Sequence, residues 1–390
     1  MRFSLVQILL ILFYIRIAVF QVKRDGITID IYTVFQIGAI VLIALILLFQ
    51  KKQNIRMSSL IGDKTYVFLF LFYLVGAISV VWSEMPFFSF YMAFQDIVLM
   101  GAAYYLVSLN NDFIEMEVYF IKLLFLMIII SFIGYVAIHP LSMVFNYHDL
   151  VTSAIAAILF CYSVGELIAL KSSNTNVWSI KRKRLLKRTL ILSLLVLAVS
   201  TSSGANVSAL FGLLSLVVFG KNIFLKLLFG MLAAIIIINP DIIQQLISLL
   251  LPGKSLEGIR TAGYRMHMWE NYFEMIQERP LLGWGFASIE RLGLYYNNDS
   301  HNSYIGAVGG VGIIGSIFLL IFIVKKTLAI YQYRILPGYW GIFAAFSAVL
   351  MNANTFGFIS SKATEVTVAF FFLVAFSYVC ANRPYISDKS

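Results

Sequence analysis

The residue best suited to proton transfer in this sequence is a histidine that precedes a glycine-rich apolar run. His301 stands near the start of the stretch SHNSYIGAVGGVGIIG, residues 300–315. An imidazole has an ordinary pKa of about 6.5, so it can accept a proton near neutral pH and act as a general base. A histidine at the start of a helix can also cap it or anchor it at an interface. Position alone favours that second role.

The remaining histidines and the cysteines do not suggest a metal site or a disulfide. No two histidines stand at the spacing of a metal-ligand pair, and both cysteines lie within apolar segments. We therefore expect neither a metal nor another cofactor. These residues are His139, His148, His267, Cys161 and Cys380.

The composition is that of a membrane protein. Of the 390 residues, 61% are hydrophobic and 12% are charged, a balance that excludes a water-soluble domain. Apolar runs of roughly 17–25 residues, long enough to cross a bilayer, recur along the chain. The sequence predicts an all-α, polytopic integral membrane protein in which residues 1–390 form a single transmembrane domain. About twelve spans are expected, at 3–22, 30–49, 66–82, 88–109, 117–138, 150–170, 187–201, 204–220, 223–239, 302–323, 338–357 and 364–381.

Basic residues orient these spans. Loops rich in Lys and Arg stay in the cytoplasm, and the net charge of +10 comes largely from such loops. The clearest are the loop at 51–64 and the run at 181–188, and with twelve spans both termini face the cytoplasm. The run at 181–188 could also be a nucleic-acid patch, but its place beside a span favours topology. We expect no nucleic-acid partner and assign this run no chemistry.

One long segment, residues 240–301, interrupts the apolar pattern and is expected on the outer side. Within it, 261–278 is predicted to be an amphipathic helix that rests on the bundle or the interface. Residues 279–285 form a predicted turn that places Trp284 near the headgroups. The polar tract at 297–300 offers an N-cap for the span that His301 opens.

Several features inside the spans have structural interpretations. Arg16 and Asp96 are expected to pair and stabilise the bundle, although charges inside a membrane are functional candidates by default. Glu166, near the inner end of its span, is expected to face water or Lys171. The glycines of the run at 306–315 are expected to let their span pack closely on a neighbour.

An ordered set of motifs over residues 260–320 carries a family resemblance. Arg265-x3-Trp269 is followed by ERPLLGWG at 278–285, then by His301-Asn302-Ser303-Tyr304 and by the GVGIIG of residues 310–315. This order resembles the C-terminal signature of the O-antigen ligase and Wzy-type polymerase superfamily. The expected spans, with one long extracytoplasmic loop before the third-last helix, also resemble the layout of that family. The resemblance implies a GT-C-like membrane glycosyltransferase.

The activity implied by the resemblance is metal-independent glycosyl transfer at the outer face of the bacterial cytoplasmic membrane. The donor would be an undecaprenyl diphosphate-linked oligosaccharide, with flippase and chain-length regulator proteins as partners beside the lipid bilayer. Because a diphosphate leaving group needs charge neutralisation, the resemblance assigns Arg265 to it, with Arg260 and Arg279 as further ligands. His301 becomes the base that deprotonates the acceptor hydroxyl. Arg265 and Arg260 could instead reach towards lipid headgroups, and Arg279 is expected to have a structural role in its turn.

The chain departs from the family pattern at one turn. Family members often carry a Thr-x-Ser-Arg-Gly-like turn before the predicted span at 204–220, and here Ser203 stands where the arginine would be. Ser202, Ser203 and the backbone amides near Gly204 could still donate hydrogen bonds to an anion.

Three functions remain in competition. A polymerase would join two lipid-linked glycans, whereas a ligase would move finished glycan onto lipid A core or another acceptor. The absent Ser-Arg turn favours the polymerase, because the ligases of the family more often retain it. A transporter would show two similar halves with broken helices, and no such repeat is seen.

Overall fold

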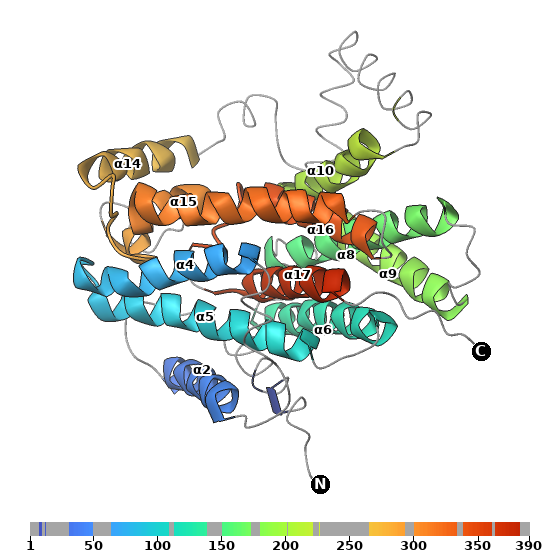
Figure 1. The fold of residues 1–390 in the computed structure, drawn as a ribbon, viewed down its shortest axis with the longest axis horizontal. Coiled ribbons are helices and arrows are strands. Elements are labelled where there is room, and N and C mark those ends of the chain that lie inside the picture. The colour runs from blue at the N-terminus through green and yellow to red at the C-terminus, as the bar shows by residue number, and fades with distance from the viewer. Residues whose placement is uncertain are drawn as a thin grey trace.

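The computed structural model describes residues 8–9, 12, 31–49, 64–108, 113–138, 150–172, 180–200, 202–220, 226, 265–292, 300–333, 338–360 and 363–382. Every regular element within these ranges is a helix, which confirms the all-α prediction. Most of the long helices run side by side along the long axis of the molecule (Figure 1).

The helices follow the predicted spans closely. They are α2 (Ile31–Phe49), α4 (Lys64–Ile78) with the short η1 (Ser79–Val81), α5 (Pro86–Ser108), α6 (Phe113–Ile138), α8 (Leu150–Ser172), α9 (Ile180–Val199), α10 (Ser203–Phe219), α14 (Arg265–Glu278), η2 (Ser288–Arg291), α15 (Ser303–Gln332), α16 (Tyr339–Asn352) and α17 (Glu365–Asn382). The predicted spans at 3–22 and 223–239 lie largely outside the described residues.

Among the residues that the structure describes, four helical segments are long and apolar enough to cross a membrane by length and composition. Shorter apolar helices accompany them, so the chain is a multi-pass membrane protein of apolar helices, while the count of twelve and the GT-C-like architecture stay predictions. The four segments are Lys64–Val81, Pro86–Val107, Leu150–Leu170 and Ser303–Gln332.

The core forms where α8, α10 and α16 pack against one another and α17 lies among α5, α6 and α8. Small residues permit the closest approaches. A Cβ atom on Gly165 of α8 would lie 2.6 Å from the carbonyl oxygen of Trp340, so only glycine allows these two helices to touch there. Close contact through small residues is how helices gain dispersion energy within a bilayer.

A buried ionic cluster ties four helices together at one end of the bundle. Arg182 of α9 donates hydrogen bonds to Glu117 of α6 and, over 2.7 Å, to Glu166 of α8. Glu166 also accepts from the backbone amides of Gly338 and Gly341 at the start of α16, over 3.0 and 2.9 Å. All three charged side chains are buried.

One expectation is therefore wrong, and a second needs an addition. Glu166 does not face water or Lys171, because Arg182 and the backbone of α16 surround it. The basic run is also more than a topological signal, because α9 begins at Ile180 and turns Arg182 inward. Asp96 of α5 is buried too, whereas its expected partner Arg16 lies outside the described residues.

Candidate active site

The start of α15 fixes the position of His301. Asn302 is the N-cap, and its side-chain oxygen accepts hydrogen bonds from the amides of Tyr304 and Ile305, over 2.9 and 3.1 Å. The prediction that residues 297–300 supply the cap is thus wrong, and the capping role considered for His301 falls to its neighbour.

His301 itself has a left-handed backbone, with φ at 49°. A non-glycine residue in this region costs about 1–3 kcal/mol, and such strain persists only where the surrounding structure imposes it. The surroundings here are well fixed. Ser300 is buried, and its hydroxyl both donates to the carbonyl oxygen of Asn302 and accepts from its amide. The histidine side chain, half-buried, therefore leaves the chain from a constrained point.

Helix α14 approaches this point along α15 (Figure 1). The indole nitrogen of Trp269 donates a 2.9 Å hydrogen bond to the carbonyl oxygen of Ser300, the residue before His301. Arg265 begins α14 one turn before Trp269, on the same face. The tryptophan of the predicted motif Arg265-x3-Trp269 thereby contacts the residue before the predicted base. The first residues of the predicted helix, 261–264, lie outside the described residues.

The turn after α14 closes on a break in α15. At Gly312, with φ at 66° and ψ at −174°, the helix is interrupted. The amides of Ile313 and Ile314 then donate to the carbonyl oxygens of Pro280 and Leu281, over 2.9 and 3.2 Å. In return, the carbonyl oxygens of residues 309 and 310 accept from the amides of residues 284 and 285. The backbone groups released by the break are thus satisfied by the turn.

The close packing expected of these glycines is confirmed, although the break was not foreseen. A Cβ atom on Gly312 would lie 2.1 Å from the carbonyl oxygen of Leu281. A side chain is therefore excluded both by this contact and by the positive φ.

Arg279 is held within the turn by its own partners. Its guanidinium donates to Glu84 over 2.7 Å and lies 3.9 Å above the ring of Trp284. The indole nitrogen of Trp284 donates to the carbonyl oxygen of Met275. The indole nitrogen of Trp82 donates to the carbonyl oxygen of Leu282. These contacts fasten the turn to α14 and to the end of α4.

A second polar element, residues 353–360 between α16 and α17, meets the start of α15. The amide of Ser303 donates to the carbonyl oxygen of Ala353 over 2.7 Å, and the hydroxyl of Ser360 donates to the carbonyl oxygen of Ser303 over 2.6 Å. The same element reaches α10, because a Cβ atom on Gly204 would lie 2.6 Å from the hydroxyl of Thr355. It thus joins the N-terminal ends of α10 and α15.

Ser202 is the N-cap residue of α10, yet its side chain makes no cap hydrogen bond. The residue is buried, and within the described part of the chain its hydroxyl has no hydrogen-bond partner. Ser203 is half-buried at the first position of the helix. The N-terminal end of a helix carries partial positive charge and unpaired amides, so this end can receive an anion.

Contacts around the start of α15 connect the segments that carry several of the predicted site residues. The Trp269–Ser300 hydrogen bond joins α14 to the residue before His301, and residues 353–360 contact both the start of α15 and the start of α10. Arg260 lies outside the described residues. Among the described residues, no group of three His, Cys, Asp or Glu side chains could hold a metal ion.

Sequence reasoning missed residues 353–360 as part of this site. A signal was present, because the polar residues Asn352, Asn354 and Thr355 interrupt the predicted span at 338–357. Polar side chains near the end of an apolar run need partners. Asn354 and Thr355 donate to carbonyl oxygens of α16, over 3.3 and 3.0 Å, and so end that helix beside α15 and α10.

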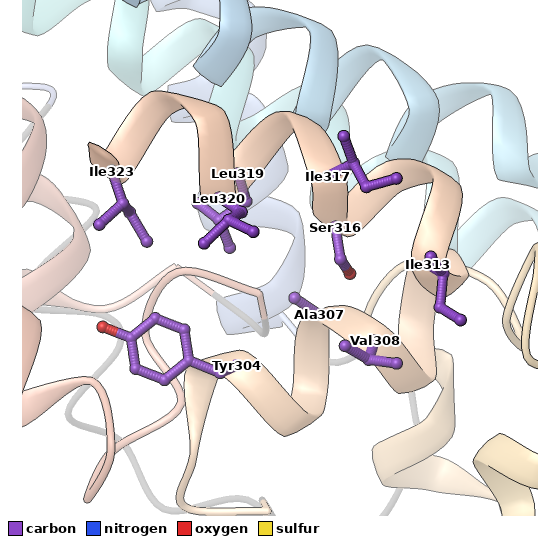
Figure 2. Close-up of a pocket in the computed structure, with 9 residues that line it drawn as sticks. All are labelled: Tyr304, Ala307, Val308, Ile313, Ser316, Ile317, Leu319, Leu320 and Ile323. Carbon is purple, nitrogen blue, oxygen red and sulfur yellow. The ribbon is translucent and has the colours of Figure 1, made fainter. Parts of the chain in front are cut away.

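A groove of about 480 Å³ lies between the two halves of α15 (Figure 2). Tyr304, Ala307 and Val308 form one wall, and residues from Ile313 to Ile323 form the other. Its lining is aliphatic apart from the hydroxyls of Tyr304 and Ser316.

Residues 188–321 match the family model described as O-Antigen ligase. The match runs from α9 into α15 and includes Ser202, Ser203, Arg265, Arg279 and His301. It confirms the resemblance drawn from the motifs. No significant match is found among the curated proteins.

Proposed function

We propose that this chain, whose residues 188–321 match the family model described as O-Antigen ligase, polymerises lipid-linked oligosaccharides into O-antigen, capsule or exopolysaccharide. The reaction would take place at the outer face of the bacterial cytoplasmic membrane. One observation carries the proposal. The hydrogen bond from Trp269 to Ser300 joins α14, the helix that begins at Arg265, to the residue before His301.

In the proposed step, His301 takes the proton of an acceptor sugar hydroxyl while that oxygen attacks the anomeric carbon of the donor. The new glycosidic C–O bond forms as the C–O bond to the diphosphate breaks, and the polyprenyl diphosphate leaves with the electron pair. A diphosphate is already a weak base, so it needs charge neutralisation rather than a proton. Arg265 would supply that charge through a planar fork that binds two phosphate oxygens.

Ser202 and Ser203 fit the second lipid carrier. The polymerase needs an acceptor that is itself linked to a polyprenyl diphosphate, and therefore a second anion site. The buried hydroxyl of Ser202 at the start of α10 is suited to donate to it, aided by the first amides of that helix. We assign Arg260 to the donor diphosphate on the resemblance alone.

Arg279 takes a different part in this proposal. Its guanidinium is engaged by Glu84 and Trp284, so a diphosphate would have to displace a carboxylate to reach it. We therefore propose that Arg279 positions the turn that supports α14 and α15. Its effect on transfer would be indirect.

The ligase is the second candidate, because the matching family model is described as O-Antigen ligase. The serine at position 203, in place of the family arginine, favours the polymerase. In both cases the substrate is an undecaprenyl diphosphate-linked oligosaccharide. A flippase and a chain-length regulator would be the proposed protein partners.

The glycan profile of a deletion strain distinguishes the candidates. Loss of a polymerase leaves single repeat units on the surface, whereas loss of a ligase leaves lipid-linked polymer that is not attached. Purified protein incubated with lipid-linked repeat units should then build a ladder of longer glycans. An unchanged surface glycan, with no ladder formed by the folded protein, would overturn both candidates.

A further inference from the structure

We propose that the groove between the two halves of α15 holds the first isoprene units of the polyprenyl chain of the donor. This assignment rests on the proposed function and deepens it, because it names the part of the substrate that each wall contacts. The groove would guide the lipid so that its diphosphate lies beside the N-terminal end of α15.

The shape of the groove follows from the break at Gly312. Because the helix is interrupted there, the side chains of Tyr304 and Val308 face those of Ser316, Leu320 and Ile323 across an open space (Figure 2). In a continuous helix, these two sets of side chains would follow one another along the same axis and could not face each other. The space is open on one side, where 60% of Leu320 is exposed. A hydrocarbon chain could therefore enter from the bilayer.

The lining suits a hydrocarbon and not a sugar. A bound sugar needs hydrogen-bond partners for its hydroxyls. The hydroxyl of Tyr304 is already used, since it donates to the carbonyl oxygen of Leu350 over 2.9 Å. The hydroxyl of Ser316 is then the one remaining side-chain polar group among the lining residues.

The volume also fits a short stretch of isoprenoid chain. A water molecule occupies about 30 Å³ of liquid, so 480 Å³ holds about sixteen groups of that size. A methylene or methyl group is of similar size, so this corresponds to about three five-carbon units. The lipid tails outside the groove are as apolar as its lining, so there is no hydrophobic driving force for a chain to leave them. Binding of an isoprenoid chain in the groove therefore depends on how well the chain fits its shape.

The direction in which the lipid would lie in the groove follows from the position of Tyr304 in the sequence. Tyr304, at one end of the groove, follows the N-cap Asn302 by two residues and His301 by three. A lipid with its head at this end would present the diphosphate where the base and the Trp269–Ser300 link lie. An ordinary phospholipid has no reason to prefer that end. The continuity of groove and proposed site thus favours the donor lipid.

A photolabelling experiment tests the assignment. The full-length protein in lipid nanodiscs is irradiated with a polyprenyl diphosphate that carries a diazirine on its second isoprene unit. Label is expected within residues 304–323, and unlabelled polyprenyl diphosphate should displace it while excess phosphatidylglycerol should not. Equal displacement by phosphatidylglycerol, or label elsewhere, would refute the groove as the donor site.

Paired variants give an independent readout. Leu320→Trp fills the groove, whereas Leu328→Trp, on the same helix at a similarly exposed position outside the lining, does not. We expect Leu320→Trp to raise the KM for a long-chain donor about tenfold and to change the KM for a donor with a single isoprene unit much less. Equal KM values for Leu320→Trp and Leu328→Trp would refute the assignment.

The two proposals can fail separately. Glycosyl transfer by the wild-type protein, together with label outside α15, would remove the groove assignment and leave the proposed function intact. Label in the groove, in a folded protein that transfers no glycan, would remove the proposed function instead.

Discussion

The indole nitrogen of Trp269 lies 2.9 Å from the carbonyl oxygen of Ser300 and donates a hydrogen bond to it. This single contact couples the helix that carries Arg265 to the residue before His301. The two proposed catalytic residues are 36 positions apart in the chain, because Arg265 begins α14 whereas His301 lies just before α15. Their relative position therefore depends on an interaction that a side-chain substitution can remove without touching either residue.

Trp269→Phe should lower kcat while leaving the KM for the donor nearly unchanged. The variant keeps the aromatic ring but loses a hydrogen bond whose net worth is about 0.5–1.5 kcal/mol, and small misplacements of catalytic groups are costly. We expect a roughly tenfold loss of kcat in purified protein. Trp284→Phe is the matched control, since it loses the bond to Met275 and should chiefly lower thermal stability. The idea fails if both variants lower kcat equally.

His301→Asn should abolish most of the transfer without loss of protein. Asparagine tolerates the left-handed backbone found at this position, so the fold should persist while the base is removed. A general base contributes about 10²–10⁴-fold, and kcat should fall by that range. The pH profile should also lose the rising limb expected near the ordinary imidazole pKa of about 6.5. Wild-type rates at every pH would show that the base lies elsewhere.

Arg265→Lys should be impaired although the charge is kept. A lysine ammonium cannot make two parallel hydrogen bonds to a diphosphate. The lost stabilisation of the transition state should be about 2–4 kcal/mol, measured as the fall in kcat/KM. Arg279→Lys serves as the comparison, because its partners are Glu84 and Trp284 and it should act through folding yield. Normal turnover by Arg265→Lys would reduce this residue to a headgroup anchor.

Arg182→Met should destabilise the protein strongly. It leaves Glu117 and Glu166 buried without their counter-charge, and breaking such a pair costs about 3–5 kcal/mol. Thermal unfolding in detergent should show a lower Tm, whereas kcat of the remaining folded protein should be unchanged. Arg184→Met, at an exposed position two residues away, is the control. Equal Tm values for these two variants would contradict the role given to the cluster.

The orientation of the bundle can be tested with single cysteines at two exposed positions. Gln277 lies at the end with the proposed site, and Lys187 lies in the basic run. In cells with a permeabilised outer membrane, an impermeant thiol reagent should label Gln277→Cys and leave Lys187→Cys unlabelled. The reverse pattern would place the site in the cytoplasm and exclude the proposed chemistry.

Local apolar patterns predicted the helices well, but their ends less well. The span expected at 302–323 continues as helix to residue 332, past two lysines that the pattern read as a loop. Lys326 is buried, and Lys325 lies 4.8 Å above the ring of Phe68 on α4. Long basic side chains can lie along apolar surface in this way, so charge alone does not end a helix.

Features that depend on distant partners could not be predicted from local sequence. The glycines of α15 indicated close packing, yet the break at Gly312 requires acceptors from Pro280 and Leu281. The inward turn of Arg182 likewise requires Glu117, 65 residues away. The order of the motifs did indicate the family model that residues 188–321 match, whereas the roles of His301 and Arg265 stay predictions.

The shared hydrogen bonds at Gly312 set an order of events during synthesis. The first half of α15, residues 303–311, is about 13 Å long and cannot cross a bilayer by itself. The carbonyl oxygens of residues 309 and 310 accept from amides of the turn at 280–285, and carbonyl oxygens of that turn accept from the amides of residues 313 and 314. Neither segment therefore has these partners in lipid before the other is present. The turn is synthesised before the glycine run, so its backbone groups lack these hydrogen-bond partners until that run has been synthesised. The proposed site is therefore assembled late in biogenesis, when two already translated segments dock.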